Sequence, residues 1–255
     1  MVSDRSSVAL LVSLALLSTT ACVEREPYRR PSTESERAEG DALAQKMQDA
    51  LGGRAAWDAV AFVDFSFIAT FAGFEAANRR HQWDKSRALL VTTTGEGKER
   101  VALDLWDKGG FATDDEGRAL TGDALADRLE DAWAHFINDS YWLCAPFKVF
   151  DDGAVRAAVD GKLRITFEKE VGLTPGDAYL YTLDDKGRPT QWSFLLESGI
   201  SGTFLFTDET TQEGVTLHRQ KQTEGGQGPR FPGLVLSRVV DDAIFSDLLA
   251  RRASR

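Results

Sequence analysis

The chain has 255 residues, of which 42% are hydrophobic and 27% are charged, a composition typical of a globular protein. Its formal net charge is −10, and no Lys/Arg-rich stripe breaks that balance, so the sequence argues against nucleic acid as a partner. The length suits one large β domain or two small ones.

The first 21 residues have the pattern of an export signal. A polar start is followed by the apolar run Val8–Leu17, which is too short to span a bilayer. The small residues before Cys22 resemble the cleavage site of a bacterial lipoprotein signal, although Thr19 stands where that site usually has Leu. The resemblance implies a lipid on the sulfur of Cys22 and cleavage before it. Ordinary secretion and a cytosolic protein with a chance apolar run are the alternatives.

The chain has two cysteines, Cys22 and Cys144. If Cys22 carries lipid, Cys144 has no partner, and its apolar neighbours predict a buried, inert thiol. If Cys22 is not lipidated, a disulfide between the two becomes possible in an oxidising compartment.

Residues 22–35 are expected to form the lipid anchor and a flexible tether, because this segment is charged, contains prolines and lacks apolar periodicity. Residues 36–255 are expected to form one domain. A helix begins it, with Leu43, Met47 and Leu51 at helical spacing and glycines directly after them.

From Ala61 the apolar period changes to two, which predicts antiparallel strands with one buried face. Val63, Phe65 and Phe67 alternate with polar residues in the first of them. The alternation recurs in residues 101–105, 163–168, 179–183, 192–196 and 215–217, with turn sequences such as Asp185-Lys186-Gly187 between the runs.

One helix interrupts the strands. Thr121 is its N-cap candidate, and an apolar stripe runs from Leu125 to Ile137. The helix is predicted to end near residues 138–140. Because strands and helices do not alternate, a doubly wound parallel sheet is excluded. The predicted fold class is α+β, with a single large curved antiparallel sheet of about nine to eleven strands, an unclosed half-barrel with helices packed as a lid.

The sequence shows neither a catalytic constellation nor a metal-ligand spacing. His81 and His218 are expected on solvated faces, and His135 as a hydrogen-bonded bystander beside the apolar stripe. Neighbouring acids such as Asp114 and Asp115 fall at turns, where carboxylates are usually solvated. The sequence therefore predicts no metal, no cofactor and no enzyme activity.

Aromatic side chains on the strands and on the second helix stand out instead. They either fill the core or line an incompletely filled apolar cavity, which would suit an acyl chain. Each buried methylene contributes about 0.8 kcal/mol, so burial alone would hold a long chain. The candidate ligand-binding residues are Phe65, Phe67, Trp106, Trp133, Phe136, Tyr141, Trp142, Tyr179, Trp192 and Phe194.

Four stretches carry a resemblance to a known family: "LGGRAAWDAV", "HQWD", "NDSYWLCAPFKVFDDG" and "VGLTPGDAYLYTLDDKGRPTQW". Together they resemble a family of largely uncharacterised bacterial exported proteins, related in fold to the outer-membrane lipoprotein-sorting carrier LolA and its membrane-anchored receptor LolB. The resemblance spans roughly residues 36–245. It implies an unclosed antiparallel barrel with helices as a lid over an apolar cavity, and it does not imply catalysis.

The resemblance also marks motif residues whose role it leaves open. Asn138 and Asp139 are expected to end the helix, and Tyr141 and Trp142 to pack between lid and sheet, with ligand contact as the alternative. The other motif positions are Pro146, Lys148, Gly172, Thr174, Pro175, Gly176 and Asp177.

The leading interpretation is a periplasm-facing outer-membrane lipoprotein that binds an acyl chain, a lipid or a lipoprotein tail. Val23 follows the cysteine that would carry the lipid. The resemblance to lipoproteins implies that Asp at this position would favour retention in the inner membrane. A secreted or soluble periplasmic protein is the alternative localisation. The functional rivals are a structural or interaction protein with a filled core and an envelope enzyme that gathers His135, Asp139 and Lys148.

Overall fold

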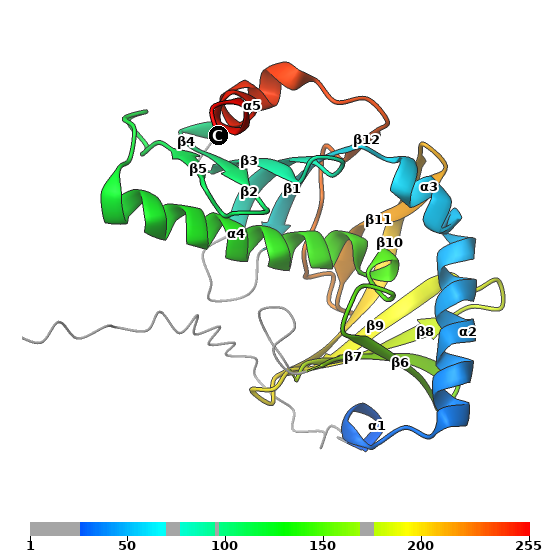
Figure 1. Cartoon of the computed structure of the whole chain (residues 1–255). Helices are drawn as coiled ribbons and strands as arrows, with labels where there is room; N and C mark the ends of the chain where they lie inside the picture. The colour runs from blue at the N-terminus through cyan, green and yellow to red at the C-terminus, as the bar shows by residue number, and fades with distance from the viewer. Residues whose placement is uncertain (1–25, 70–76, 95–96, 169–175) are drawn as a thin grey trace, which may run out of the picture.

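The computed structural model describes residues 26–69, 77–94, 97–168 and 176–255 (Figure 1). The expected signal, Cys22 and the motif residues Gly172, Thr174 and Pro175 lie outside these ranges. The described residues include twelve strands in two six-stranded antiparallel sheets, with helices packed against them. The prediction of an open antiparallel α+β fold is confirmed.

The first sheet has the strand order β12-β1-β2-β3-β4-β5. Its strands are β1 (Phe62–Ala69), β2 (Ala77–Asp84), β3 (Leu89–Thr94), β4 (Glu99–Asp104), β5 (Gly110–Ala112) and β12 (Val235–Ser237). The second sheet has the order β11-β10-β9-β8-β7-β6. Its strands are β6 (Ala154–Val159), β7 (Lys162–Phe167), β8 (Ala178–Leu183), β9 (Pro189–Leu195), β10 (Ser201–Gln212) and β11 (Val215–Gln222).

The two sheets meet at Arg230, whose backbone pairs with Ile68 of β1 and with Gln220 of β11. The expected single curved sheet is therefore divided in two, because β1 and β11 come together through the intervening segment 229–232, whose backbone bonds to both strands, and not along their lengths. The junction keeps the aromatic faces of both sheets turned toward one shared core.

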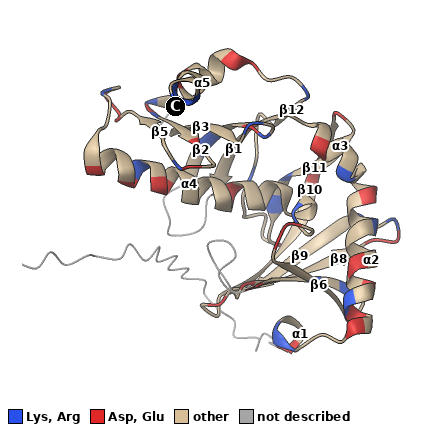
Figure 2. Ribbon diagram, in the orientation of Figure 1, with Lys and Arg blue, Asp and Glu red and all other residues tan. Residues whose placement is uncertain are grey.

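The helices are α1 (Glu26–Arg29), α2 (Glu34–Ala50), α3 (Gly53–Ala59), α4 (Gly122–Cys144) and α5 (Ser246–Ala253), with short 3-10 turns η2 (Ala145–Phe147) and η3 (Asp242–Phe245). Thr33 begins α2 with a capping box, because its hydroxyl accepts from the backbone of Glu36 and the Glu36 side chain accepts in return. Acidic and basic residues are mixed along α2 and α4 and form no basic patch there (Figure 2). No helix in the described ranges has the length and apolarity needed to cross a membrane.

Helices cover both faces of the first sheet. The N-terminal half of α4 packs Leu129 and Phe136 on one face, and η3 and α5 pack Phe245 and Leu248 on the other. Strand β4 is therefore buried on both sides, and the alternation expected for residues 101–105 is absent from its burial pattern. The apolar alternation in the sequence was misleading here, because the segment that covers the second face of β4 comes from the C-terminal end of the chain.

Successive side chains of β7, β8 and β9 point to opposite faces of the second sheet, and the main core lies against the aromatic face. The predicted alternation of burial is absent from these strands, because Ala178, Leu180 and Leu195 on the other face are buried with Tyr28. Leu163 and Ile165 point into this core with α2, α3 and the end of α4, while Arg164 points to the opposite face. The predicted hairpin loop at residues 185–187 joins β8 to β9, where Gly187 has φ +87 and its amide donates to Asp184 O.

The expected tether is shorter than residues 22–35. Residues 26–29 form α1, Tyr28 is buried against the second sheet, and Nη1 of Arg164 donates to the carbonyls of Pro27 and Arg30. A buried arginine that needs acceptors draws this charged segment onto the body, which its composition did not indicate.

The predicted end of α4 near residues 138–140 is wrong. The helix continues for more than another turn to Cys144, because Asp139 points into the core instead of capping the helix. Thr121 is the N-cap residue, but its side chain accepts no capping hydrogen bond.

Candidate functional site

Helix α4 crosses from one sheet to the other (Figure 1). Its N-terminal half covers the first sheet, and its last turns place Tyr141 and Trp142 over the second sheet. Residues 141–144, predicted to follow the end of the helix, are thus the part of the helix that faces the second sheet.

Aromatic rings on three neighbouring strands of that sheet form a layer that we call the aromatic floor. Tyr181 and Trp192 lie opposite each other in register and stack with ring centroids 6.0 Å apart, and Tyr179 stacks on Trp192 at 5.2 Å. Phe194 and Phe204 stack at 6.0 Å. The aromatic floor consists of Tyr179, Tyr181, Trp192, Phe194 and Phe204.

Tyr141 and Trp142 cover the aromatic floor while remaining only half-buried. The Tyr141 ring lies 5.1 Å from that of Tyr179, and the Trp142 ring meets Trp192 edge-on at 4.8 Å. Burial raises the pKa of the Tyr141 hydroxyl well above its usual value, so the group is a neutral donor throughout the physiological range.

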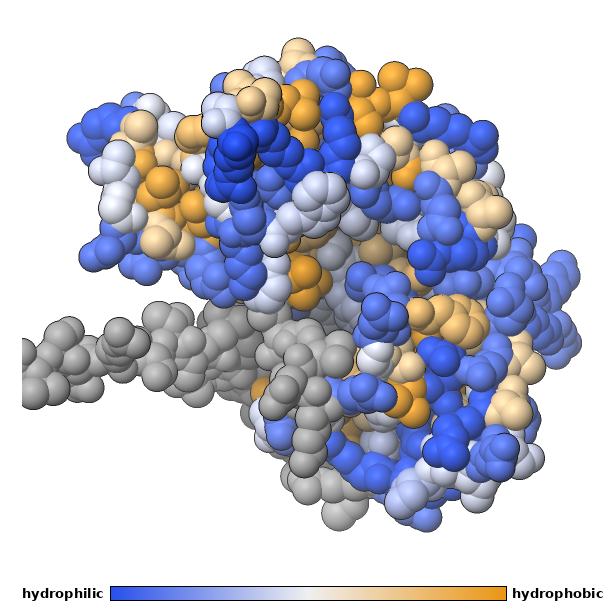
Figure 3. Space-filling model, viewed as in Figure 1, coloured by the Kyte–Doolittle hydropathy of each residue, from blue (hydrophilic) through white to orange (hydrophobic). Residues whose placement is uncertain are grey.

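Further half-buried apolar side chains continue the site at one end of the second sheet. They pack against the main core without being enclosed by the described residues: Phe167, Leu196 and Ile200. In Figure 3 the molecule is hollowed between its upper part, which carries α4, and its lower part, which carries the second sheet. The site therefore combines a closed aromatic layer with a partly open apolar edge.

Two polar atoms of the aromatic floor are buried without a hydrogen-bond partner of good geometry among the described residues: Oη of Tyr181 and Nε1 of Trp192. Burial raises the pKa of Tyr181, and the neighbouring Tyr141 hydroxyl lowers it without forming a well-made bond. Leaving a buried donor unsatisfied costs about 1–3 kcal/mol.

The structure brings only part of the predicted ligand-binding set together. Tyr141, Trp142, Tyr179, Trp192 and Phe194 meet at the aromatic floor.

The other five candidates lie elsewhere. Phe65 and Phe67 pack against Phe231 in the same core, while Trp133 and Phe136 belong to the separate cluster on the first sheet. Trp106 is 75% exposed, with the Arg252 guanidinium 4.3 Å from its ring centroid.

A buried ion network joins α4 to the first sheet. Asp139 Oδ2 accepts from Nε of Arg79 at 2.7 Å, and Nε2 of His81 lies 2.9 Å from the same oxygen. Burial alone would raise the pKa of Asp139, but the bonds from His81 and Arg79 outweigh it and hold that pKa below its ordinary value. The expectation of a solvated His81 is wrong, because α4 covers it with a carboxylate.

Thr92, His81 and Asp139 follow the order of a hydroxyl–imidazole–carboxylate triad, since Nδ1 of His81 lies 2.9 Å from Oγ1 of Thr92. All three side chains are buried, so the Thr92 hydroxyl is not placed to attack a substrate. Its role in this structure is to fix the histidine between two strands and a helix.

Lys221 is buried below the end of α4. Its Nζ donates to Leu143 O at 3.3 Å and to His218 O at 3.4 Å, and the rings of Phe206 and Phe231 lie within 5.2 Å of it. Burial lowers its pKa to about 7. In the sequence, Lys221 continues the alternation of Val215 and Leu217. This position on the predicted buried face is the signal that could have identified it as a buried lysine.

The described motif residues make structural contacts. Pro146 O accepts from Gln48, Lys148 pairs with Asp151 at 2.7 Å, and Asp177 Oδ1 accepts from Glu197 N at 2.9 Å. Gly176 O accepts from Arg29 at 2.5 Å. Lys148 and Asp139 therefore bind different partners, and the enzyme constellation with His135 is not assembled.

Cys144 is buried as predicted, its Sγ–H donating to Ser140 O at 2.9 Å. Burial raises the pKa of this thiol to about 11, which keeps it unreactive.

A polar surface hollow of about 280 Å³ lies on the second sheet. His218 lines it and is nearly buried, in contrast to the solvated position expected, and burial lowers its pKa to about 4. The charges of Arg188 and Glu209 at this hollow pair with each other at 3.1 Å, so neither is left to attract a charged ligand.

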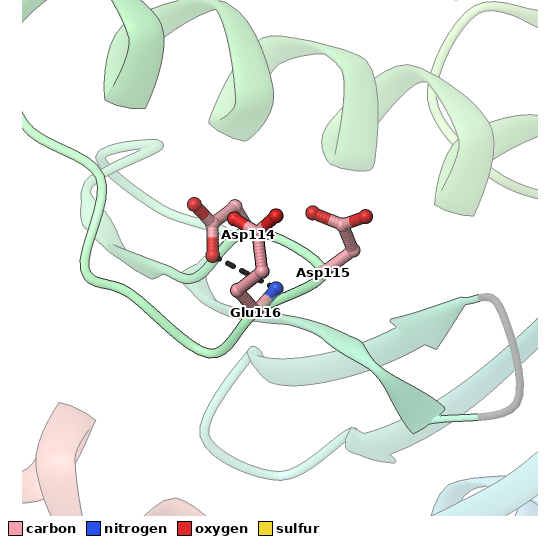
Figure 4. Close-up of side chains that lie close together, drawn as sticks. All are labelled: Asp114, Asp115 and Glu116. Carbon is pink, nitrogen blue, oxygen red and sulfur yellow. Dashed lines mark hydrogen bonds between the residues drawn. The ribbon is translucent and has the colours of Figure 1, made fainter.

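Carboxylate oxygens of Asp114, Asp115 and Glu116 lie within 4.8 Å of one another at a turn (Figure 4). Such a group could hold a cation, but Arg118 pairs with both Asp114 and Glu116 and already supplies positive charge.

Comparisons with known proteins add little to this geometry. No family model and no curated protein matches the chain. A solved structure of a LolA superfamily protein from Nitrosomonas europaea matches with a TM-score of 0.42 and 10% sequence identity, over 81% of this chain and 96% of that one. The superfamily is the one that the sequence resembles, but the likeness is at most a distant one of fold and carries no conclusion about ligand or activity.

Proposed function

We propose that this protein is an exported lipoprotein, anchored through Cys22 and facing the periplasm from the outer membrane, that binds an acyl chain of a lipid or lipoprotein non-covalently. The ligand lies between α4 and the aromatic floor. One observation carries the proposal: Tyr141 and Trp142 extend over the aromatic floor yet stay half-buried, beside an edge of half-buried Phe167, Leu196 and Ile200.

Burial of apolar surface supplies the binding free energy, because an acyl chain gains about 0.8 kcal/mol for each methylene removed from water. The buried Tyr181 hydroxyl, which lies beside that of Tyr141, and the Trp192 indole N–H are both able to donate. They suit an acyl ester or amide carbonyl oxygen better than a carboxylate, since no cation contacts either atom among the described residues.

Native mass spectrometry tests the proposal on residues 24–255, exported without Cys22 and purified without detergent. A discrete added mass that leaves on denaturation and is identified as an acyl lipid supports it. A mass that stays ligand-free after incubation with lipid extract contradicts it.

Fluorine NMR of protein labelled with 5-fluorotryptophan locates the ligand. Addition of a phospholipid should shift the resonances of Trp142 and Trp192, while exposed Trp106 serves as the internal control. A shift at Trp106 alone would place binding elsewhere.

The second candidate is an interaction lipoprotein with a filled core. The tight stacking of Tyr179 on Trp192, which is 1% exposed, favours it. It predicts no copurifying lipid and no ligand-dependent shift at either tryptophan.

A further inference from the structure

The chain is fixed to the body very soon after the expected lipid anchor. Tyr28 of α1 packs on the face of the second sheet opposite to the aromatic floor, against Ala178, Leu180 and Leu195. Arg164 holds α1 there through the carbonyls of Pro27 and Arg30, at 3.2 and 2.7 Å. The body therefore begins at Glu26 and not at the start of α2.

The last residue of α1 also binds one end of the second sheet. The Arg29 guanidinium donates to Gly176 O at 2.5 Å and to Leu196 O at 3.0 Å. Leu196 opens the turn between β9 and β10, closed by the bond from Leu196 N to Ile200 O at 2.8 Å. We call α1 together with turn 196–200 the anchor end.

Covalent geometry limits how far the anchor lies from this end. Four residue steps from Cys22 to Glu26 span at most about 14 Å, and the single turn of α1 adds about 6 Å. Acyl chains on Cys22 thus enter the bilayer within roughly 20 Å of Arg29, whatever path the intervening residues take.

We propose that the anchor end is the surface that the protein holds against a phospholipid bilayer, an inference that rests on the proposed lipidation of Cys22. Helix α5 lies at the opposite side of the molecule from α1 and faces away from the membrane (Figure 1). The half-buried Leu196 and Ile200, which adjoin the aromatic core, then open toward the lipid, so an acyl chain passes between bilayer and site without crossing water.

A matched pair of cysteine variants of the full-length lipidated protein tests the orientation. Ser198→Cys lies in turn 196–200, Ser254→Cys lies at the end of α5, and both serines are exposed. Cys22 is blocked by lipid and Cys144 is buried, so an environment-sensitive fluorophore labels one position in each variant. The proteins are placed in phosphatidylethanolamine–phosphatidylglycerol vesicles that contain nitroxide-labelled lipid.

The fluorophore at position 198 should lose most of its emission, and that at position 254 should keep most of it. Insertion of about twenty Gly/Ser residues after Val23, which span about 25 Å on average, should abolish the difference. Equal quenching without the insertion overturns the proposed orientation, whereas the ligand binding of residues 24–255 would be unaffected. If the vesicles bind the Cys22→Ala variant as strongly as the parent protein, the proposed lipid anchor is overturned.

Discussion

Nε2 of His81 lies 2.9 Å from Oδ2 of Asp139, and neither side chain has any exposed surface. Together with Arg79, this pair attaches α4 to the first sheet just before the helix turns toward the second. The position of Tyr141 and Trp142 over the aromatic floor therefore depends on an ionic contact that lies less than one turn earlier in the helix.

Asp139→Asn should destabilise the protein by about 3–5 kcal/mol, because it leaves the Arg79 and His81 groups without their carboxylate inside the core. Urea unfolding followed by circular dichroism measures the change. Asp131→Asn, an exposed acid on the same helix, should stay within about 0.5 kcal/mol of the parent. An equally small effect at position 139 would show that the network contributes nothing to stability.

Lys221 should make stability rise with pH above neutrality. Its pKa falls from 10.5 to about 7 on folding, so between these values the unfolded chain binds a proton that the folded chain does not. Below pH 7 the buried lysine is charged in the folded chain, so its destabilising effect is largest. The effect decreases as the pH rises toward 10.5. Thermal unfolding from pH 6.5 to 10 in parent and Lys221→Met should show this rise only in the parent.

His218 should also make stability rise with pH, but in a lower pH range. Its pKa drops from 6.5 to about 4 on folding, so stability is lost as pH falls between those values. His218→Gln should flatten the stability profile in that range and leave the profile between pH 7 and 10.5 unchanged. If His218→Gln altered only the alkaline range, the assignment of the two groups would be wrong.

Gly40→Ala should destabilise the protein by about 1–3 kcal/mol, although alanine is the better helix former by about 1 kcal/mol. A Cβ at position 40 would lie 2.5 Å from backbone atoms of Ala157, where α2 packs on β6. The reverse exchange at an exposed site of the same helix, Ala38→Gly, should cost about 1 kcal/mol. A stabilised Gly40→Ala would mean that α2 does not pack this closely.

Arg164→Met should release α1 from the second sheet, because two carbonyls lose their buried donor. Trypsin should then cleave after Arg29 much faster than in the parent, whereas the bond after Arg30 resists trypsin in both because Pro31 follows it. Arg219→Met, which removes an exposed arginine of β11, serves as the control and should leave cleavage there unchanged. Equal protection in both variants would show that Arg164 is not needed to hold α1, which Tyr28 and Arg29 then keep in place.

Local patterns were enough to predict β7, β8, β9, β11 and the hairpin loop of the second sheet, whereas β6 was not predicted. The alternation at Leu163 and Ile165 and the turn at Gly187 can be recognised from neighbouring residues alone. One face of these strands meets the core, as such an alternation predicts. The same argument correctly placed Phe65 and Phe67 on a buried face of β1.

The candidate site was less accessible to sequence analysis because it depends on contacts between distant segments. His81 carries no local sign that Asp139 will cover it, and Asp139 in turn lies in a sequence typical of a helix end. Trp106 and Trp192 both follow alternating runs in the sequence, yet Trp106 lies in the turn after β4 and is 75% exposed, while Trp192 lies in β9 and is 1% exposed. The sequence alternation does not show where β4 ends.

The pairing of Arg230 with Ile68 bears on the order in which the protein is made. β1 has β2 beside it within a few residues, but its other neighbours, Arg230 and β12, follow more than 150 residues later in the chain. A chain that is synthesised from its N-terminus therefore holds one unpaired strand edge until almost all of it has been made. Synthesis is the stage at which this edge most needs protection, and a copy shortened before residue 230 would keep it open to proteases and to other chains.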